Sequence, residues 1–285
     1  MQLDPISFIQ TVPSLSALPA IYYRLNDAIN NPSVSLKDIA GIIEKDPALA
    51  AQLLRIANSA LFKFPSQVTT ITQAITIVGT QQLKDLTLAC KVISAFPKIQ
   101  VEAVTDEQFW HHSIAVGIAA RVLAASRRES NVERYYVIGL LHDIGRLLIY
   151  LMKPQLAGQA RSICQQDHRL LFKVEDEIMQ TSHSELSGLL LKHWNLPDSL
   201  WEPVLHHHNP SLARNYPDEA AVIHIADVLA HTLQLGTSGE LAIPPLSPEA
   251  WEKLGLHPEQ LADILQEIEF QFNESIKILR PQRLH

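Results

Sequence analysis

Histidine and aspartate residues recur inside apolar stretches with helical spacing, and this placement constrains the fold more than any other feature of the chain. The sequence has 285 residues, of which 13 are histidines. A buried imidazole or carboxylate on an apolar helix face needs a partner. Neutral imidazoles and carboxylates are the usual ligands of zinc, manganese and iron ions. The residues placed in this way are His112, His142, Asp143, His183, His206, His207, His208 and Asp227.

The apolar pattern predicts an all-α fold, because no segment shows the alternation of a half-buried β-strand. Ser35 and Asp38 have the spacing of a capping box, and Asp46-Pro47 is a typical helix start. Later helices are predicted over residues 109–125, 135–151 and 198–208. Polar and proline-containing breaks predict three parts: an N-terminal helical lobe (1–97), a second helical lobe (98–235), and a C-terminal linker with two helices (236–285).

Composition excludes some partners and favours others. The formal net charge is −7 and no run of lysine or arginine stands out, so we expect no nucleic-acid partner. Charged residues make up only 19% of the chain, which favours apolar patches that bind a protein partner.

Targeting and redox features are also few. Arg146 and Lys153 interrupt the longest apolar run before it reaches the ~18 residues of a membrane span, so we expect no membrane partner. The start of the chain has no signal-peptide pattern, and the two cysteines form neither a disulfide framework nor a metal motif. A cytoplasmic, bacterial protein is expected.

Helical phase separates the histidines. His112 shares an apolar face with its neighbours at three and four residues, whereas His206 points away from the buried side that Val204 marks. His207 and His208 flank that buried side. A single histidine on such a face is more often a hydrogen-bonded core residue than a ligand. Because five separate helical segments each present a ligand-type residue, we predict a shared site for one metal ion or a pair; an all-α core without metal is the alternative.

Two stretches carry a resemblance to a known family. LLHDIGRLLIYL, with His112 upstream and Asp227 downstream, resembles the HD superfamily of metal-dependent phosphohydrolases. The N-terminal third is similar to the HDOD domain, a bacterial relative of the HD and HD-GYP signalling domains, through LPAIYYRLNDAI, IIEKDPALAAQLLRIANSALF and VTTITQAITIVGTQQLKDLTLA. The resemblance covers roughly residues 10–235 and implies a multi-helical HD-like domain with an N-terminal helical lobe.

The resemblance also implies a ligand set. One divalent ion would be held by His112, His142, Asp143 and Asp227, and a second by residues that match His183, His207 and His208. A shift by one residue would give His206 and His207 instead. Asp143 would bridge the two ions and act as a catalytic residue. Arg146 stands where HD enzymes often have a lysine, and it would supply positive charge for a phosphate. Iron, manganese, zinc and magnesium all remain candidates.

The chain departs from the enzyme pattern after the histidine pair. HHHNPSLARNYPDE has neither the glutamate nor the Gly-Tyr-Pro motif of HD-GYP domains, and only Tyr216-Pro217 remains. We therefore expect a signalling or regulatory HDOD module that acts mainly by binding a protein partner or a phosphate or nucleotide ligand. The alternative is a metal-dependent phosphohydrolase that acts on a nucleotide or a cyclic dinucleotide.

Overall fold

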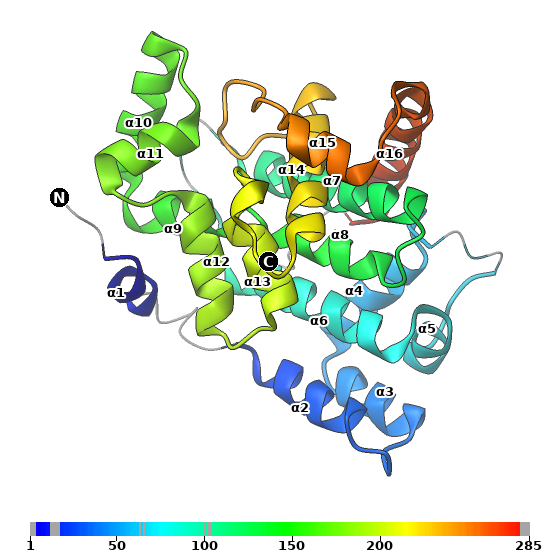
Figure 1. Ribbon diagram of the computed structural model, residues 1–285. Coiled ribbons are helices and arrows are strands. Elements are labelled where there is room, and N and C mark those ends of the chain that lie inside the picture. The colour runs from blue at the N-terminus through cyan, green and yellow to red at the C-terminus, as the bar shows by residue number, and fades with distance from the viewer. Residues whose placement is uncertain are drawn as a thin grey trace. The chain divides into compact units, whose positions relative to one another are not determined.

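The protein is built from helices (Figure 1). The computed structural model describes residues 4–11, 18–62, 64, 66–99, 101 and 104–279. Within these ranges the only β-type pairing is an isolated bridge between Val101 and Val104. The prediction of an all-α fold is confirmed.

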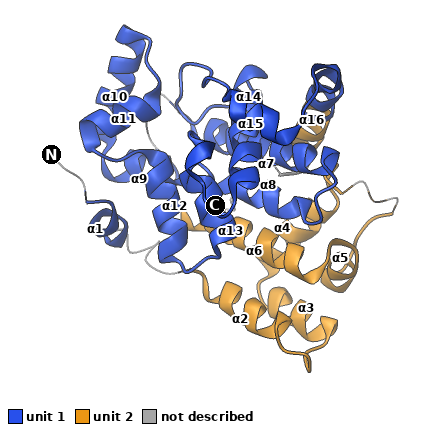
Figure 2. Ribbon diagram, in the orientation of Figure 1, with its two compact units in different colours: residues 1–16, 97–268 blue, residues 17–96, 269–285 orange. Residues whose placement is uncertain are grey.

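The chain divides into two compact units, which Figure 2 colours separately. Unit 1 comprises residues 1–16 and 97–268, and unit 2 comprises residues 17–96 and 269–285. The three-part division at residues 97 and 235 as folding domains stays a prediction. The long α16 (Pro258–Leu279) begins in unit 1 and ends in unit 2.

Among the described residues between 17 and 96, unit 2 holds five helices, three of which begin with a side-chain cap. They are α2 (Ala20–Ile29), α3 (Leu36–Glu44), α4 (Pro47–Ala57), α5 (Ile71–Val78) and α6 (Thr80–Ala95). The Ser35–Asp38 capping box opens α3, and the Asp46 carboxylate accepts from the backbone N–H of Leu49 at 3.0 Å to open α4. Apolar faces pair α2 with α3, α3 with α5, and α4 with α6.

Unit 1 is built around α7, which is buried along most of its length and packs against α8 and α14. A second group pairs α12 with α9 and α13, and α10 with α11. The helices that lie wholly in unit 1 are α1 (Pro5–Gln10), α7 (Asp106–Ser126), α8 (Val132–Leu141), α9 (Ile144–Met152), α10 (Pro154–Asp167), α11 (Leu171–Met179), α12 (His183–His193), α13 (Asp198–Leu205), α14 (Pro217–Thr232) and α15 (Pro248–Leu254). A 3-10 turn lies at Pro210–Leu212.

Glycine lets α7 and α8 approach closely. A Cβ at Gly139 would lie 2.7 Å from the Cα of Gly117, so any side chain at this crossing would push the two backbones apart. Gly139, the α8 residue at this crossing, precedes His142 by three residues. The ring Nδ1 of His142 donates to the carbonyl of Gly139 at 2.6 Å. The close approach therefore fixes where this histidine leaves the helix.

Two predicted helices are shorter than expected. The helix over residues 135–151 is broken at His142 and Asp143, which end α8 and open α9. The helix from residue 198 ends at Leu205 and not at His208; beyond it residues 206–208 form a turn, in which Nδ1 of His207 donates to the carbonyl of Val204. Both helix ends that differ from the prediction lie next to predicted ligands. A continuous helix would separate adjacent side chains by about 100°, and a turn removes that restriction.

One stretch, Val132–Met152, is long and apolar enough to cross a membrane by length and composition. However, 83% of its apolar window is buried inside the protein, as expected for core helices.

Candidate metal centre

The structure brings all seven predicted ligand residues together inside unit 1. They come from five points of the helical framework: α7, the α8–α9 turn, the start of α12, the turn after α13, and α14. The side chains are almost fully buried except that of His208, which is half-buried. The seven residues are His112, His142, Asp143, His183, His207, His208 and Asp227.

One group of ligand atoms gathers around Asp227. Nε2 of His112 lies 3.2 Å from Oδ1 of Asp227, and Nε2 of His142 lies 3.7 Å from the same oxygen. Oδ2 of Asp143 lies 3.5 Å from Nε2 of His142 and 3.9 Å from Nε2 of His112. Two imidazoles and two carboxylates thus share one small volume, and such a donor set suits a divalent transition metal ion.

A second group lies on the other side of Asp143. Its Oδ1 is 3.0 Å from Nε2 of His183 and 3.8 Å from Nε2 of His207. Nε2 of His208 lies 2.9 Å from Nε2 of His183. The two carboxylate oxygens of Asp143 therefore face different groups of histidines, which is the arrangement a bridging ligand requires. His206 does not belong to the clusters of candidate ligands found among the described residues.

Hydrogen bonds at the far side of two of the rings select the nitrogen that faces the centre. The Nδ1 atoms of His142 and His207 donate to the carbonyls of Gly139 and Val204, at 2.6 and 2.7 Å. These bonds place the proton on Nδ1 and leave the Nε2 lone pair facing the centre.

The centre leaves buried polar atoms without hydrogen-bond partners. Within the described ranges these include Nε2 of His112, His142 and His207, together with Oδ1 of Asp143 and of Asp227. Leaving so many buried acceptors unsatisfied costs about 1–3 kcal/mol each. Because a divalent cation would satisfy them together, the residues fit a metal ion.

Burial and neighbouring charges set the protonation states of His112, His207 and Asp143. It lowers the pKa of His112 to about 4 and that of His207 to about 3, so both rings are neutral at pH 7. Burial raises the pKa of Asp143, but His142, Arg146 and His183 outweigh it and hold the pKa well below the usual range. Neutral imidazoles and an ionised carboxylate are the protonation states that metal ligation requires.

Arg146 lies behind the second group and is only 1% exposed. Nη1 of Arg146 donates to Oγ of Ser238 at 2.9 Å, and Nη2 lies 2.7 Å from Nδ1 of His183. Its Nε lies 3.5 Å from the Glu175 carboxylate. The guanidinium is thus surrounded by protein groups, and its role as a catalytic cation stays a prediction.

Two residues close to the centre are not among the predicted ligands. Glu175 on α11 accepts from Nδ1 of His183 at 2.5 Å, as an outer carboxylate that orients a ligating histidine. His231 lies 3.3 Å from Asp227 and could join His112 and Asp227 as a ligand. The spacing of four residues between Asp227 and His231 was a usable signal.

We expect the metal-free protein to be most stable near pH 6.5. The folded pKa values of His112 and His207 lie below the unfolded value of 6.5. The stability that these two residues contribute is therefore lost as the pH falls below 6.5. Burial and Arg146 lower the pKa of His183, but Glu175 and Asp143 raise it to about 9, so its contribution is lost between pH 6.5 and 9. Urea unfolding of chelator-treated protein at several pH values measures this. Stability that rises steadily from pH 6.5 to 9 would contradict the expectation.

Comparison with known proteins agrees with the helical fold described above. A sequence model of the HDOD domain matches residues 15–210, and the chain therefore belongs to the HDOD family. An uncharacterized protein of Treponema pallidum (strain Nichols) is 28% identical over 225 residues, which cover 78% of this chain and 43% of that protein. The chain thus spans less than half the length of this curated relative.

Two solved structures are similar over nearly the whole chain. An HDOD domain protein of unknown function from Geobacter sulfurreducens superposes with a TM-score of 0.80 at 22% identity, covering 96% of both chains. A protein from Shewanella amazonensis SB2B, described as a "putative phosphohydrolase", has a TM-score of 0.75 at 27% identity, covering 96% of this chain and 98% of its own.

Proposed function

We propose that this chain is a regulatory HDOD module whose buried centre holds one or two divalent metal ions, and that it acts by binding a protein partner or a phosphate-bearing ligand. The observation that carries the metal part is the set of unsatisfied lone pairs facing one another across Asp143. A bound ion there would supply Lewis acidity toward a phosphoryl oxygen. Iron, manganese, zinc and magnesium remain candidates for this ion.

The regulatory part is supported by what surrounds the ligands. Hydrolysis of a phosphate ester needs cationic groups that stabilise the charge developing on the phosphate. Among the ion pairs of the described residues, Arg146 is the only lysine or arginine that pairs with Asp143, Asp227 or Glu175. Because Arg146 is buried among these partners, it is poorly placed to bind a substrate phosphate.

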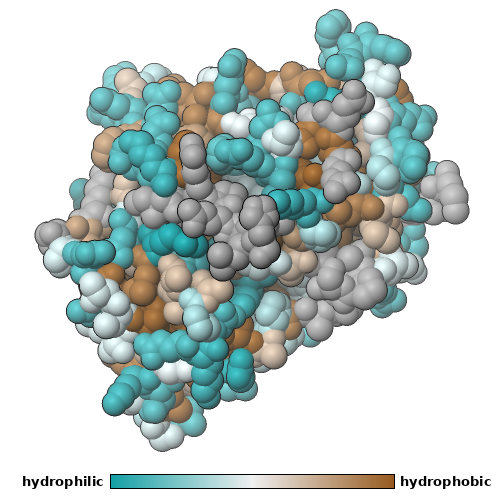
Figure 3. Space-filling view, turned by 180° about the vertical axis from the view of Figure 1, so that it is seen from behind, coloured by the Kyte–Doolittle hydropathy of each residue, from teal (hydrophilic) through white to brown (hydrophobic). Residues whose placement is uncertain are grey.

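A partner-binding role is supported by apolar residues at the surface. On the face that Figure 3 shows, hydrophobic and hydrophilic residues are intermixed. In unit 1 the segment before α15 exposes three large apolar side chains, Leu241, Ile243 and Leu246. Exposed apolar residues this close together along the chain favour a protein-binding surface.

The proposal is tested by metal content and hydrolysis on the same preparation. We expect about one or two ions per chain by mass spectrometry, and no turnover of a generic phosphodiester or a cyclic dinucleotide above background with added manganese or iron. Asp143→Ala is the control for any residual activity. Metal-dependent turnover that this variant abolishes would overturn the regulatory proposal.

The same experiment decides the second candidate function, a metal-dependent phosphohydrolase. The position of Asp143 between two groups of histidines favours this candidate, because two-metal sites of this kind can clamp both the attacking and the leaving oxygen. The description of the Shewanella amazonensis protein as a phosphohydrolase adds support.

A further inference from the structure

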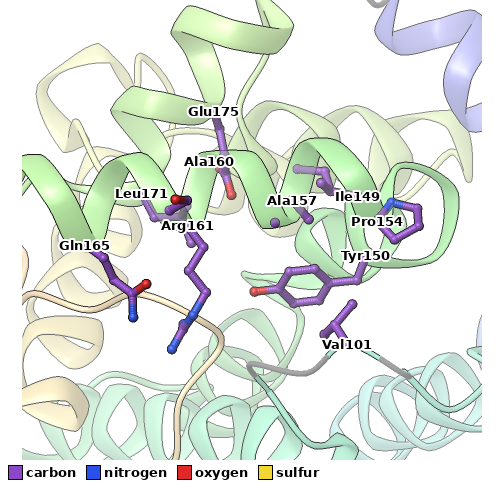
Figure 4. A pocket seen from close by; sticks show the side chains of 12 residues that line it. Val101, Ile149, Tyr150, Pro154, Ala157, Ala160, Arg161, Gln165, Leu171 and Glu175 are labelled. Atoms are coloured by element: carbon purple, nitrogen blue, oxygen red, sulfur yellow. The ribbon is translucent and has the colours of Figure 1, made fainter.

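A pocket with a volume of 620 Å³ lies in unit 1 between α9, α10 and α11 (Figure 4). This volume falls within the range of about 300–1,000 Å³ that small-molecule sites occupy. One of its walls is Glu175, the residue that accepts from Nδ1 of His183. The pocket is therefore separate from the ligand atoms of the metal centre but shares one residue with its outer layer.

The walls of the pocket are mostly apolar, with a few polar groups. Val101, Ile149, Ala157, Ala160 and Leu171 supply apolar surface, and the small side chains on α10 leave the space open. The polar groups include Tyr150, Arg161 and Gln165. An apolar cavity with few polar groups is typical of a site that binds an organic molecule in one orientation.

Arg161 gives the pocket a positive charge. Its Nη1 donates to the carbonyl of Gly239 at 3.0 Å, and none of the ion pairs among the described residues involves Arg161. A guanidinium has five N–H donors in a planar fork that matches a carboxylate or a phosphate. Donors therefore remain for an anionic ligand.

Two neighbours allow an anion at this position. Figure 4 shows the Tyr150 ring extending from α9 toward the region that Arg161 reaches from α10. The Tyr150 hydroxyl donates to the carbonyl of Ser238 at 2.6 Å, and burial raises its pKa, so it stays a neutral phenol. The Glu175 carboxylate accepts from Nδ1 of His183 at 2.5 Å and lies 3.5 Å from Nε of Arg146, and these contacts limit its repulsion of an anion.

We propose that this pocket binds a small organic anion, a molecule with one carboxylate or phosphate group on an apolar or planar body. Arg161 binds the anionic group, and the apolar walls contact the body. Inorganic phosphate alone leaves most of the 620 Å³ unfilled and binds weakly. The site needs no metal ion, so the proposal stands apart from the function proposed for the metal centre.

Two variants remove the site by different means. Arg161→Gln removes the charge and keeps an amide of similar reach. Gly158 lines the pocket on α10, and a Cβ added there meets no atom within 4 Å, so Gly158→Leu fills the space without a clash in the backbone. Gly41 on α3 has the same open surroundings in unit 2, which makes Gly41→Leu the matched control.

Thermal unfolding of the full chain in chelator tests the proposal, with adenosine monophosphate, octanoate and inorganic phosphate as probes. We expect one organic anion to raise Tm by about 5 °C at 100 times its Kd, and inorganic phosphate to change it by less than about 1 °C. Stabilisation by the nucleotide identifies a phosphate ligand, and stabilisation by octanoate identifies a carboxylate ligand. The shift should vanish in Arg161→Gln and Gly158→Leu and persist in Gly41→Leu.

Three outcomes would overturn the proposal. The first is that neither organic anion changes Tm. The second is an equal effect of inorganic phosphate, which would indicate a simple anion site. The third is a shift that survives in both pocket variants or disappears in Gly41→Leu. Because chelator is present throughout, none of these results depends on whether the metal centre works as proposed.

Discussion

Asp143→Ala is expected to lower metal affinity by at least ~100-fold, above the 10–100-fold range that follows the loss of an outer-shell partner. The reason is geometric: Oδ2 of Asp143 faces His112 and His142, and Oδ1 faces His183 and His207. A single substitution therefore removes a ligand from both groups. The helical fold should persist, because the buried apolar faces around the centre supply most of the burial energy.

Metal stoichiometry after dialysis, measured beside far-UV dichroism and thermal unfolding, tests this expectation. Asp176→Ala is the matched control, because Asp176 is an exposed carboxylate on α11 and should leave the metal content unchanged. Full metal retention in Asp143→Ala would refute the assignment of this ligand. Global unfolding of the variant would show that the centre is structural.

The clustering of the candidate ligands could be predicted because two independent signals agreed. Helical phase placed His112 on an apolar face, and the resemblance to the HDOD domain supplied the order of the remaining ligands. Phase also separated His206 from its two neighbours, and the structure places His207 and His208 with His183. The all-α fold followed from the same periodicity, because each amphipathic stripe needs a neighbour to cover it.

The exact ends of the helices around the ligands could not be predicted from periodicity alone. An apolar run such as VIGLLHDIGRLLIYL satisfies a helical pattern whether or not the backbone turns at its centre. The turn at His142 and Asp143 depends on tertiary contacts: Gly145 lies against α12, and α7 crosses at Gly139.

Glu175, an outer residue of the centre, could not be predicted from the sequence for a different reason. Glu175 stands beside Asp176 and Glu177, and an acidic run usually reads as a solvated face. Only its spacing of four from buried Leu171 indicates that this carboxylate turns inward. The pocket beside it depends on how α9, α10 and α11 meet, which no single segment encodes.

The largest loss of stability is expected from Gly145→Ala. A Cβ at this position would lie 2.2 Å from the carbonyl oxygen of His183 and 2.6 Å from the backbone nitrogen of Ser187. Both neighbours are backbone atoms, so relief requires α9 and α12 to move apart. Overpacking of this kind costs about 3 kcal/mol, which corresponds to a decrease in Tm of roughly 6 °C or more. The backbone N–H of Gly145 also donates to Oγ of Ser187 at 2.8 Å, and that bond would lengthen.

Gly158→Ala is the matched control, because it makes the same change within a helix where the added Cβ meets open space. Alanine has the higher helix propensity, so this variant should gain about 0.5–1 kcal/mol. The two variants should therefore shift Tm in opposite directions, and equal Tm values would refute the close contact between α9 and α12.

The contact involves the carbonyl of His183 itself, so displacement of α12 should also move this histidine away from Asp143. Gly145→Ala is thus expected to weaken metal binding as well as folding. Loss of stability with unchanged metal affinity would show that His183 keeps its place without this contact.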